Sequence, residues 1–191
     1  MSEHLEPLWA KYDKLLRKLD DPGVNSLLEN LGERLIVCPA GTKTTQKGCE
    51  PGGLIDYHLG VTDVMRKVSQ ALGDNCSTGS ILKVGLLHEI GKVGDLDNDL
   101  FLSQDSSWHR EKLGQLYKYN EAVQKMPVAQ RTLYLLQHFN VQLTLDEWIA
   151  IQVSQGLHLD ENKFYIGALP PLAVLLTAAR SLFLPNKVEA E

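Results

Sequence analysis

Residues 81–94, with the sequence ILKVGLLHEIGKVG, place the adjacent ionisable residues His88 and Glu89 at the end of an apolar helix. A helix of this composition belongs in the interior of a fold, where an ionisable side chain needs a hydrogen bond, a counter-charge or a metal ion. Any fold of this chain must therefore supply partners for both residues. Either the pair binds a metal, or it is a buried hydrogen-bonded pair, and the second interpretation is favoured.

Apolar residues recur every three or four positions through most of the chain, which is typical of amphipathic helices. Pro127 fits the first turn of a helix that runs to about Phe139. Thr144 followed by Glu147 is a capping-box pattern and predicts a helix over residues 145–153. The sequence therefore predicts an all-α helical bundle, whose other helices are expected at residues 5–19, 25–33, 54–72 and 172–184.

Irregular segments separate these helices. Residues 38–53 contain two prolines, four glycines and three threonines, and are expected to form a long ordered loop. Residues 95–125 are polar and aromatic, and long loops of this kind often carry function. Residues 157–166 are expected to form an extended turn or a short β-hairpin. We interpret the chain as a single domain, residues 1–191, with N-terminal helices (1–37), a core (38–184) and a frayed tail (185–191).

The composition favours a soluble protein with a substantial core. The chain has 191 residues, of which 43% are hydrophobic and 23% charged, with a net charge of −5 and a pI ≈ 5.7. This acidic balance argues against non-specific nucleic-acid binding, and no apolar run has the length of a membrane span. The charged, helical N-terminal segment differs from a signal peptide. We therefore expect an intracellular protein that is not secreted.

The three cysteines, Cys38, Cys49 and Cys76, are odd in number and form no CxxC pair. This usage indicates a reducing compartment and favours buried thiols. A zinc site formed by Cys38, Cys49 and a histidine is the less favoured alternative.

The segment ILKVGLLHEIGK, residues 81–92, resembles the metal-binding core of the HD-domain phosphohydrolases, in which a buried helix ends in His-Asp and continues as Ile-Gly-Lys. The resemblance extends over roughly residues 38–183 and implies a helical bundle with a central metal pocket. In active members it implies hydrolysis of phosphate esters with divalent ions. The segments that resemble the phage-type branch of this superfamily, in the same order, are residues 52–61, 108–120, 131–151, 155–166 and 171–183.

The resemblance also assigns metal-ligand positions, and most of them hold a residue of another type. His88 is retained, Glu89 replaces an aspartate, and Tyr57 lies where the first ligand histidine is expected. His58 follows one residue later, which is about 100° further around a helix, so we expect it to point away from the cluster, at the surface or behind the ligands. The other substituted positions are Ser154, Gln155, Thr177 and Arg180.

These substitutions oppose metal binding. Tyr57 binds a metal only as a phenolate, and a phenol titrates near pH ~10. Arg180 replaces a carboxylate with a permanent cation. At about 4 Å and an effective dielectric constant of about 20, this cation repels each unit of metal charge by roughly 4 kcal/mol. We therefore expect no bound metal, and we predict a bidentate salt bridge between Glu89 and Arg180, with Tyr57 nearby.

The favoured interpretation is a catalytically degenerate HD-like protein, encoded by a bacteriophage, with a binding, scaffold or virion-assembly role. We expect it to bind a protein partner or to form a homo-oligomer, in the host cytoplasm or in the virion, without a cofactor. One alternative is a phosphohydrolase acting on nucleotides or other phosphate esters. In it, Mn²⁺, Mg²⁺ or Fe²⁺ is held by His88, Glu89 and a rearranged ligand, His58 or His109. A second alternative is a nucleotide sensor that does not hydrolyse its ligand.

Several side chains have both a functional and a structural interpretation. In the hydrolase alternative, Lys92 joins His88 and Glu89 as a catalytic candidate. His109 and Arg110 are interpreted as packing the aromatic loop around Trp108, which is favoured over contact with a substrate. The candidate anion- or nucleotide-binding residues of the sensor alternative are Lys92, Arg180, His109 and Arg110.

Three aromatic residues, Tyr134, Trp148 and Phe164, lie at helical or hairpin spacing. Aromatic residues at such spacing are more often core residues than stacking platforms. We therefore expect all three in the core.

Overall fold

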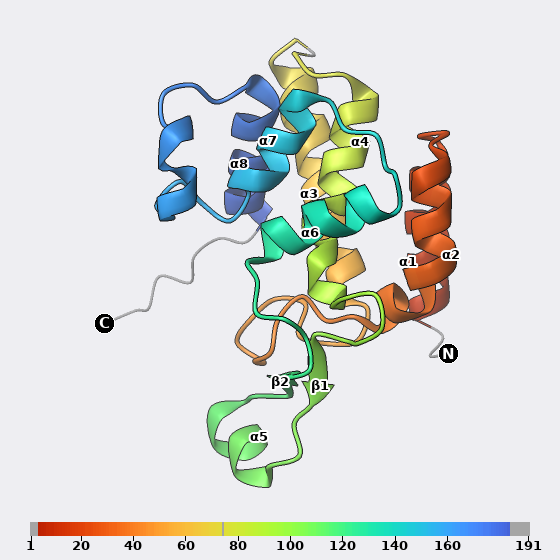
Figure 1. The fold of residues 1–191 in the computed structure, drawn as a ribbon, viewed down its shortest axis with the longest axis vertical. Helices are drawn as coiled ribbons and strands as arrows, with labels where there is room; N and C mark the ends of the chain where they lie inside the picture. Colours follow the sequence, from red (N-terminus) through yellow and green to blue (C-terminus); the bar gives the residue numbers. More distant parts are fainter. Residues whose placement is uncertain (1–3, 74, 184–191) are drawn as a thin grey trace.

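A computed structural model describes residues 4–73 and 75–183 as a bundle of helices from which a small hairpin arm extends (Figure 1). This architecture confirms the all-α prediction with one short hairpin. Within the described residues, no helix combines the length and the apolar composition needed to cross a bilayer. The elements in chain order are α1 (Leu5–Arg17), α2 (Pro22–Val37), α3 (Gly53–Ala71), α4 (Thr78–Leu87), η1 (Ile90–Val93), β1 (Phe101–Ser103), α5 (Ser107–Leu113), β2 (Tyr117–Tyr119), α6 (Val128–His138), α7 (Leu145–Val153), η2 (Asp160–Tyr165) and α8 (Pro171–Phe183).

Helix α3 is the central element of the bundle. It packs against α1, α2, α4 and α8, and its apolar side chains Leu54, Val61 and Met65 are completely buried. The apolar helix α4 lies along α3 and also contacts α1, α7 and α8. Because α3 is surrounded by four helices, its polar residues Tyr57 and His58 are also inside the core.

The helix boundaries follow from the periodicity and the caps of the sequence. Helix α3 begins and ends one residue before the expected bounds, and α7 has the expected bounds. Helix α8 begins one residue early, and its expected end at residue 184 lies outside the described residues. The capping box of α7 is present, with Thr144 and Glu147 each accepting from the backbone of the other. Helix α2 is longer than expected, because Asp21 caps it by accepting from Gly23 and Val24. The tail expected at residues 185–191 lies outside the described residues.

The long loop between α2 and α3 is irregular, as expected, and it is ordered by backbone hydrogen bonds to the hairpin arm. The amide of Thr44 donates to the carbonyl of Gly114 (2.8 Å), and the amide of Leu116 donates to the carbonyl of Thr42 (2.8 Å). The arm itself comprises β1, α5 and β2, and none of the residues of α5 is buried. It extends from one end of the bundle (Figure 1).

The predicted place of the hairpin was wrong. The strands are β1 and β2, which pair antiparallel within the polar segment 95–125, and the rings of Phe101 and Tyr119 pack across them with centroids 5.4 Å apart. Residues 157–166 instead contain the 3₁₀ helix η2. Its Asn162 is buried and binds both the carbonyl of Gly156 (2.8 Å) and the side chain of Gln152 (3.0 Å). These bonds hold the segment against the end of α7 and favour a compact turn.

The expectation that three aromatic residues lie in the core was also wrong. Tyr134, Trp148 and Phe164 are 48%, 39% and 94% exposed. Helices α6 and α7 turn other residues inward, among them Leu135 and Ile151, which are completely buried. Helical spacing alone did not identify which face of each short helix would be covered.

Cys38, Cys49 and Cys76 are free thiols, of which the first two are buried and the third is half-buried. Burial raises the pKa of Cys38 to about 12, so this thiol is protonated and unreactive at neutral pH. The predicted buried thiols are therefore confirmed at Cys38 and Cys49.

Candidate functional site

The end of helix α4 brings His88 and Glu89 into the centre of the bundle. The backbone amide of His88 still donates to the carbonyl of Val84 (3.0 Å), whereas the chain leaves the helical conformation at Glu89 and continues into η1. His88 and Glu89 are 0% and 1% exposed. The turn fits against α6 because Gly91 has no side chain: a Cβ atom there would lie 2.6 Å from the carbonyl oxygen of Val128.

Both carboxylate oxygens of Glu89 have a cationic partner. The Nη2 atom of Arg180 lies 2.6 Å from Oε1, and the Nζ atom of Lys92 lies 2.7 Å from Oε2. Gln155 also donates to Oε1, at 2.8 Å. The carboxylate is therefore held by one cation from α8, one from η1 and an amide that follows α7.

The expected ion pair between Glu89 and Arg180 is present, but it is not bidentate. Only one guanidinium nitrogen contacts the carboxylate, while Nε donates to the hydroxyl of Tyr57 at 2.8 Å. Arg180 thus joins Tyr57 on α3 to Glu89. Lys92 makes further contacts, donating to the carbonyl of Ala40 (2.7 Å) and lying 5.6 Å from the centroid of the Tyr57 ring.

The charges of this cluster are fixed by their mutual contacts. Burial alone would raise the pKa of Glu89, but Lys92 and Arg180 outweigh it and hold that pKa well below its usual range. For Tyr57, burial and the neighbouring Glu89 raise the pKa to about 12, although Arg180 acts in the opposite direction. Glu89 is therefore ionised at neutral pH, and Tyr57 is a neutral phenol.

Two histidines form a second layer of the cluster, on the side of α1 and α4. The ring of His58 lies 5.0 Å from that of His88, centroid to centroid. The Nδ1 atom of His88 lies 3.0 Å from the carbonyl oxygen of Gly85, and Nδ1 of His58 lies 3.5 Å from the hydroxyl of Tyr12. Neither Nε2 atom has a hydrogen-bond partner within the described residues. Burial lowers the pKa of both imidazoles, that of His88 to about 4, so both rings are neutral at pH 7.

The expectation that His58 points away from the cluster was wrong, and of its two expected places, at the surface or behind the ligands, the structure shows the second. Tyr57 and His58 do point in different directions from α3, as expected for consecutive residues of a helix. Tyr57 faces α8, whereas His58 faces α1 and α4. Tyr57 therefore bonds Arg180, while His58 packs between Tyr12 and His88.

The other sequence-predicted residues are divided between the cluster and the rest of the fold. Gln155 belongs to the cluster through Glu89. Ser154 is buried, and its hydroxyl has no partner among the described residues, whereas Thr177 donates to the carbonyl of Ala173 in its own helix (2.9 Å). His109 and Arg110 lie on α5 in the arm, where their side chains bond Ser106 and the carbonyl of Gln104.

Sequence reasoning missed Tyr12 as a member of the cluster. Its hydroxyl is completely buried and donates to the carbonyl of Leu86 at 2.6 Å, which fixes the N-terminal helix α1 to the end of α4. The signal was a tyrosine at a core position of an amphipathic helix, because a buried hydroxyl requires a partner.

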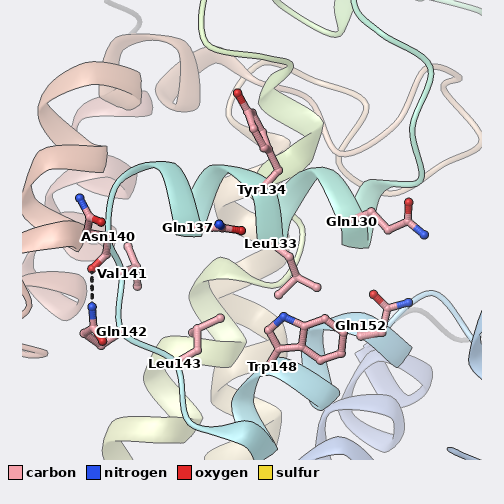
Figure 2. Close-up of a pocket in the computed structure, with 10 residues that line it drawn as sticks. All are labelled: Gln130, Leu133, Tyr134, Gln137, Asn140, Val141, Gln142, Leu143, Trp148 and Gln152. Atoms are coloured by element: carbon pink, nitrogen blue, oxygen red, sulfur yellow. Dashed lines mark hydrogen bonds between the residues drawn. The ribbon is translucent and has the colours of Figure 1, made fainter.

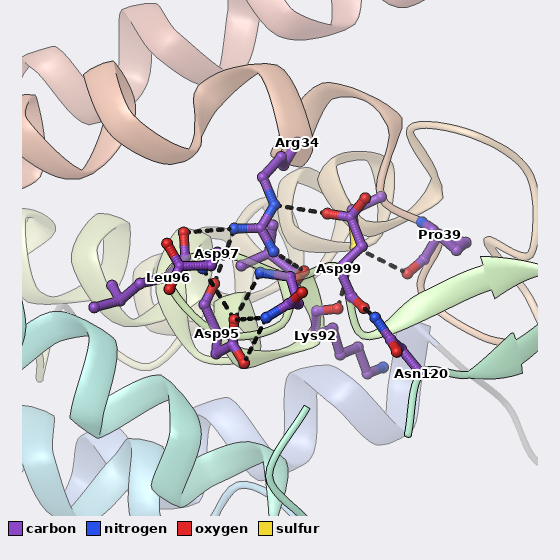
Figure 3. A network of polar contacts seen from close by, with 11 residues as sticks. Arg34, Pro39, Lys92, Asp95, Leu96, Asp97, Asp99 and Asn120 are labelled. Atoms are coloured by element: carbon purple, nitrogen blue, oxygen red, sulfur yellow. Dashed lines mark hydrogen bonds and ion pairs between the residues drawn. The ribbon is translucent and has the colours of Figure 1, made fainter. Parts of the chain in front are cut away.

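A separate polar network stabilises the turn that follows η1 (Figure 3). Arg34 pairs with Asp99 (Nε to Oδ1, 2.6 Å). Its other nitrogens donate to the carbonyls of Val93, Asp95 and Leu96 at 3.0, 2.9 and 3.1 Å. The guanidinium of Arg34 thus provides hydrogen-bond donors for three carbonyl groups of the turn, so we interpret this network as structural.

The central cluster does not fit a catalytic divalent ion. Such a site needs carboxylate oxygens and neutral imidazoles that are free to coordinate, but both oxygens of Glu89 are bonded to cations. Three atoms of ligand type in the cluster have no hydrogen-bond partner within the described residues: Nε2 of His58, Nε2 of His88 and Oε2 of Glu89. The last forms the ion pair with Lys92, and the charges of Lys92 and Arg180 act on both imidazoles and oppose a metal cation.

The chain was compared with protein families, with curated proteins and with solved structures, and none of them matches it.

Proposed function

We propose that this chain is a catalytically degenerate HD-like protein in which an ion-pair network replaces the metal centre, and that it works by binding other macromolecules. The single observation that carries the proposal is the position of Glu89. Its two oxygens are bonded to Arg180 and Lys92, at 2.6 and 2.7 Å, so the carboxylate that the resemblance assigns to a metal serves to anchor α8 and η1.

The same residues would stabilise the fold in the absence of a metal. A buried carboxylate with no partner is strongly destabilising, whereas one that is hydrogen-bonded and paired is tolerated. Arg180, Lys92 and Gln155 together supply this pairing. The network would then do what a central ion does in a metal-dependent relative, namely hold several helices around one point.

The proposed role is that of a scaffold, an assembly component or a modulator of another protein, encoded by a bacteriophage and located in the host cytoplasm or in the virion. An exposed arm supports such a role: Trp108 is 57% exposed on α5, and Tyr119 is 65% exposed on β2. Exposed aromatic residues of this kind are enriched in protein–protein contacts.

The two alternatives have less support. A hydrolase that uses His109 as a rearranged ligand would need this residue near His88, but His109 lies on the arm. The other rearranged ligand, His58, does lie near His88 (5.0 Å between ring centroids), but the carboxylate of Glu89 that would join them is paired with Arg180 and Lys92. A nucleotide sensor would need Lys92 and Arg180 to be available for phosphate, but both are paired with Glu89.

The proposal is tested by a turnover screen of the purified full chain with Mn²⁺, Mg²⁺ and Fe²⁺, using p-nitrophenyl phosphate and the common nucleoside triphosphates. We expect no turnover above that of the denatured protein. A useful comparison is the triple variant Tyr57→His, Glu89→Asp, Arg180→Asp, which rebuilds the ligand types at three of the positions that the resemblance assigns. Metal-dependent turnover by the wild-type chain that is lost in His88→Ala would contradict the proposal.

The binding role is tested in parallel by measuring the mass of the full chain in solution by light scattering, alone and after mixing with candidate partners. We expect a stable assembly, either with a second copy or with a partner. A strictly monomeric chain that is active as a phosphatase would contradict the binding role.

A further inference from the structure

A groove of about 550 Å³ lies between α6 and α7, on a part of the molecule that the central cluster does not use. All residues that line it are uncharged (Figure 2). Its volume lies in the range of small-molecule sites. Its polar lining comprises Trp148 and five residues with carboxamide side chains: Gln130, Gln137, Asn140, Gln142 and Gln152. Gln152 lies beside the indole, whereas Gln142 lies at the other end of the groove and bonds the carbonyl of Asn140 at 3.2 Å (Figure 2).

Several hydrogen-bonding groups of the groove are free. In the described part of the chain, the side chains of Gln130 and Gln137 and the indole N–H of Trp148 make no hydrogen bond. Gln152 uses its Nε2 to bind Asn162 (3.0 Å), and no hydrogen bond to its amide oxygen is found within residues 4–73 and 75–183. The groove therefore offers both donors and acceptors to a ligand.

Hydrogen bonds and an ion pair on the sides of α6 and α7 that face away from the groove fix its two walls. On α6, the hydroxyl of Thr132 accepts from the backbone amide of Gly91 at 3.0 Å. Helix α7 begins at a complete capping box, and Lys83 contacts its Glu147 at 3.4 Å. A wall that is fixed before binding loses little conformational entropy on binding, so the groove is suited to a ligand of defined shape.

We propose that this groove binds a neutral saccharide. Sugar hydroxyls both donate and accept hydrogen bonds, as carboxamides do, and the C–H face of a sugar ring packs on an aromatic ring. Figure 2 shows the indole of Trp148 below the side chain of Leu133 and to the right of that of Leu143, with Gln152 on its other side. This arrangement combines one apolar platform with amides at its edge.

Other ligand classes fit the lining less well. Phosphates and carboxylates require a cation or several aligned donors, and no charged residue lines the groove. A purely apolar ligand would remove water from the amides without replacing its hydrogen bonds. A nucleobase is held best between two surfaces, but the hydroxyphenyl group of Tyr134 points away from Trp148, on the other side of α6 (Figure 2).

The proposal is tested by titrating the isotope-labelled full chain with maltose, lactose and N,N′-diacetylchitobiose, following the indole N–H of Trp148 and the glutamine side-chain amides by NMR. At least one saccharide is expected to cause saturable shifts of Trp148. Trp148→Ala should weaken its binding about tenfold or more, and Gln137→Ala, an exposed change that leaves the core untouched, should weaken it by a smaller factor. Phe164→Ala is the control, because Phe164 is an aromatic residue that is 94% exposed and does not line the groove, and it should leave binding unchanged.

Three outcomes would overturn the proposal. The first is that none of the saccharides causes a saturable shift of Trp148. The second is that binding is retained in both Trp148→Ala and Gln137→Ala, or is lost equally in Phe164→Ala. The third is that adenosine, titrated in the same way, shifts Trp148 at lower concentration than any saccharide. None of these results tests the proposed metal-free centre, so each of the two proposals can fail without affecting the other.

Discussion

At Glu89, a buried carboxylate is kept ionised by two cations that reach it from different parts of the chain. Arg180 and Lys92 contact opposite oxygens, and Gln155 adds a neutral hydrogen bond. A buried ion pair of this kind contributes little net stability compared with apolar residues, but removal of one partner leaves a charge without compensation. The cluster therefore contributes mainly to specificity: arrangements of α3, α8 and η1 that separate these charges are strongly disfavoured.

Removal of Arg180 is expected to be costly. Arg180→Met should leave the hydroxyl of Tyr57 without its donor and Glu89 with a single cation, lowering the free energy of unfolding by about 3 kcal/mol. This change can be measured by urea denaturation. The double variant Arg180→Met, Glu89→Gln should recover part of the loss, because the unpaired charge is then absent.

The matched control for this prediction is Arg17→Met, which removes an arginine from the exposed ion pair with Asp13 on α1. Surface pairs contribute little, so the stability should hardly change. Equal effects of the two substitutions would show that Glu89 does not depend on Arg180.

The buried histidines predict acid sensitivity. Burial lowers the pKa of His88 from 6.5 to about 4. Between these values the unfolded chain binds more protons than the folded one, so stability decreases as the pH falls from 6.5 towards 4. At about 1.4 kcal/mol per pKa unit, His88 alone accounts for a loss of about 3 kcal/mol. Glu89, whose pKa is also lowered, contributes in the same direction below its usual pKa.

Urea denaturation at a series of pH values measures this slope, and His88→Asn tests its source. The substitution keeps a donor near the carbonyl of Gly85 and removes the titrating ring. Its unfolding free energy should depend less on pH between 6.5 and 4 than that of the wild type. An unchanged slope in the variant would assign the acid sensitivity to other groups.

The turn between α4 and η1 is the element on which the cluster depends. It holds Glu89 and Lys92 in position because Gly91 lies directly against α6, where its amide donates to the hydroxyl of Thr132 and its carbonyl accepts from Arg131. The close approach explains why the Ile-Gly-Lys segment contains a glycine at this point, without any appeal to metal chemistry.

Gly91→Ala is expected to separate the turn from α6. A Cβ atom would lie 2.6 Å from the carbonyl oxygen of Val128 and 2.7 Å from the amide nitrogen of Thr132. Both are backbone atoms, so the elements themselves must move, and the stability should fall by about 2 kcal/mol. Gly79→Ala is the matched control in α4, since its nearest neighbour would be 4.0 Å away, and it should be neutral or slightly stabilising. Thermal denaturation of both variants provides the comparison, and equal melting temperatures would contradict the packing argument.

At the level of elements, the sequence predicted what periodicity and capping determine. Helix α7 was predicted from Thr144 and Glu147, and α3 from its apolar repeat, because both signals are local. The hairpin position was missed, since the pairing of β1 with β2 spans the whole of α5. The 3₁₀ helix η2 was missed because it depends on the contact of Asn162 with Gln152 of α7.

In the whole molecule, the cluster is assembled from elements far apart in the sequence. Tyr12, His58, His88 and Arg180 come from α1, α3, the end of α4 and α8. The pairing of Glu89 with Arg180 could be predicted because the resemblance placed both at one point. The roles of Tyr12 and His58 could not, because they depend on the packing of α1 against α3 and α4, which no local sequence signal indicates.

The metal content of the full chain tests the central claim most directly. The purified protein is incubated with Mn²⁺, Mg²⁺ or Fe²⁺, passed through a desalting column and measured by inductively coupled plasma mass spectrometry. We predict that no metal is retained, because Arg180 and Lys92 occupy both oxygens of Glu89. An equimolar amount of retained metal that is lost in His88→Ala would contradict the account.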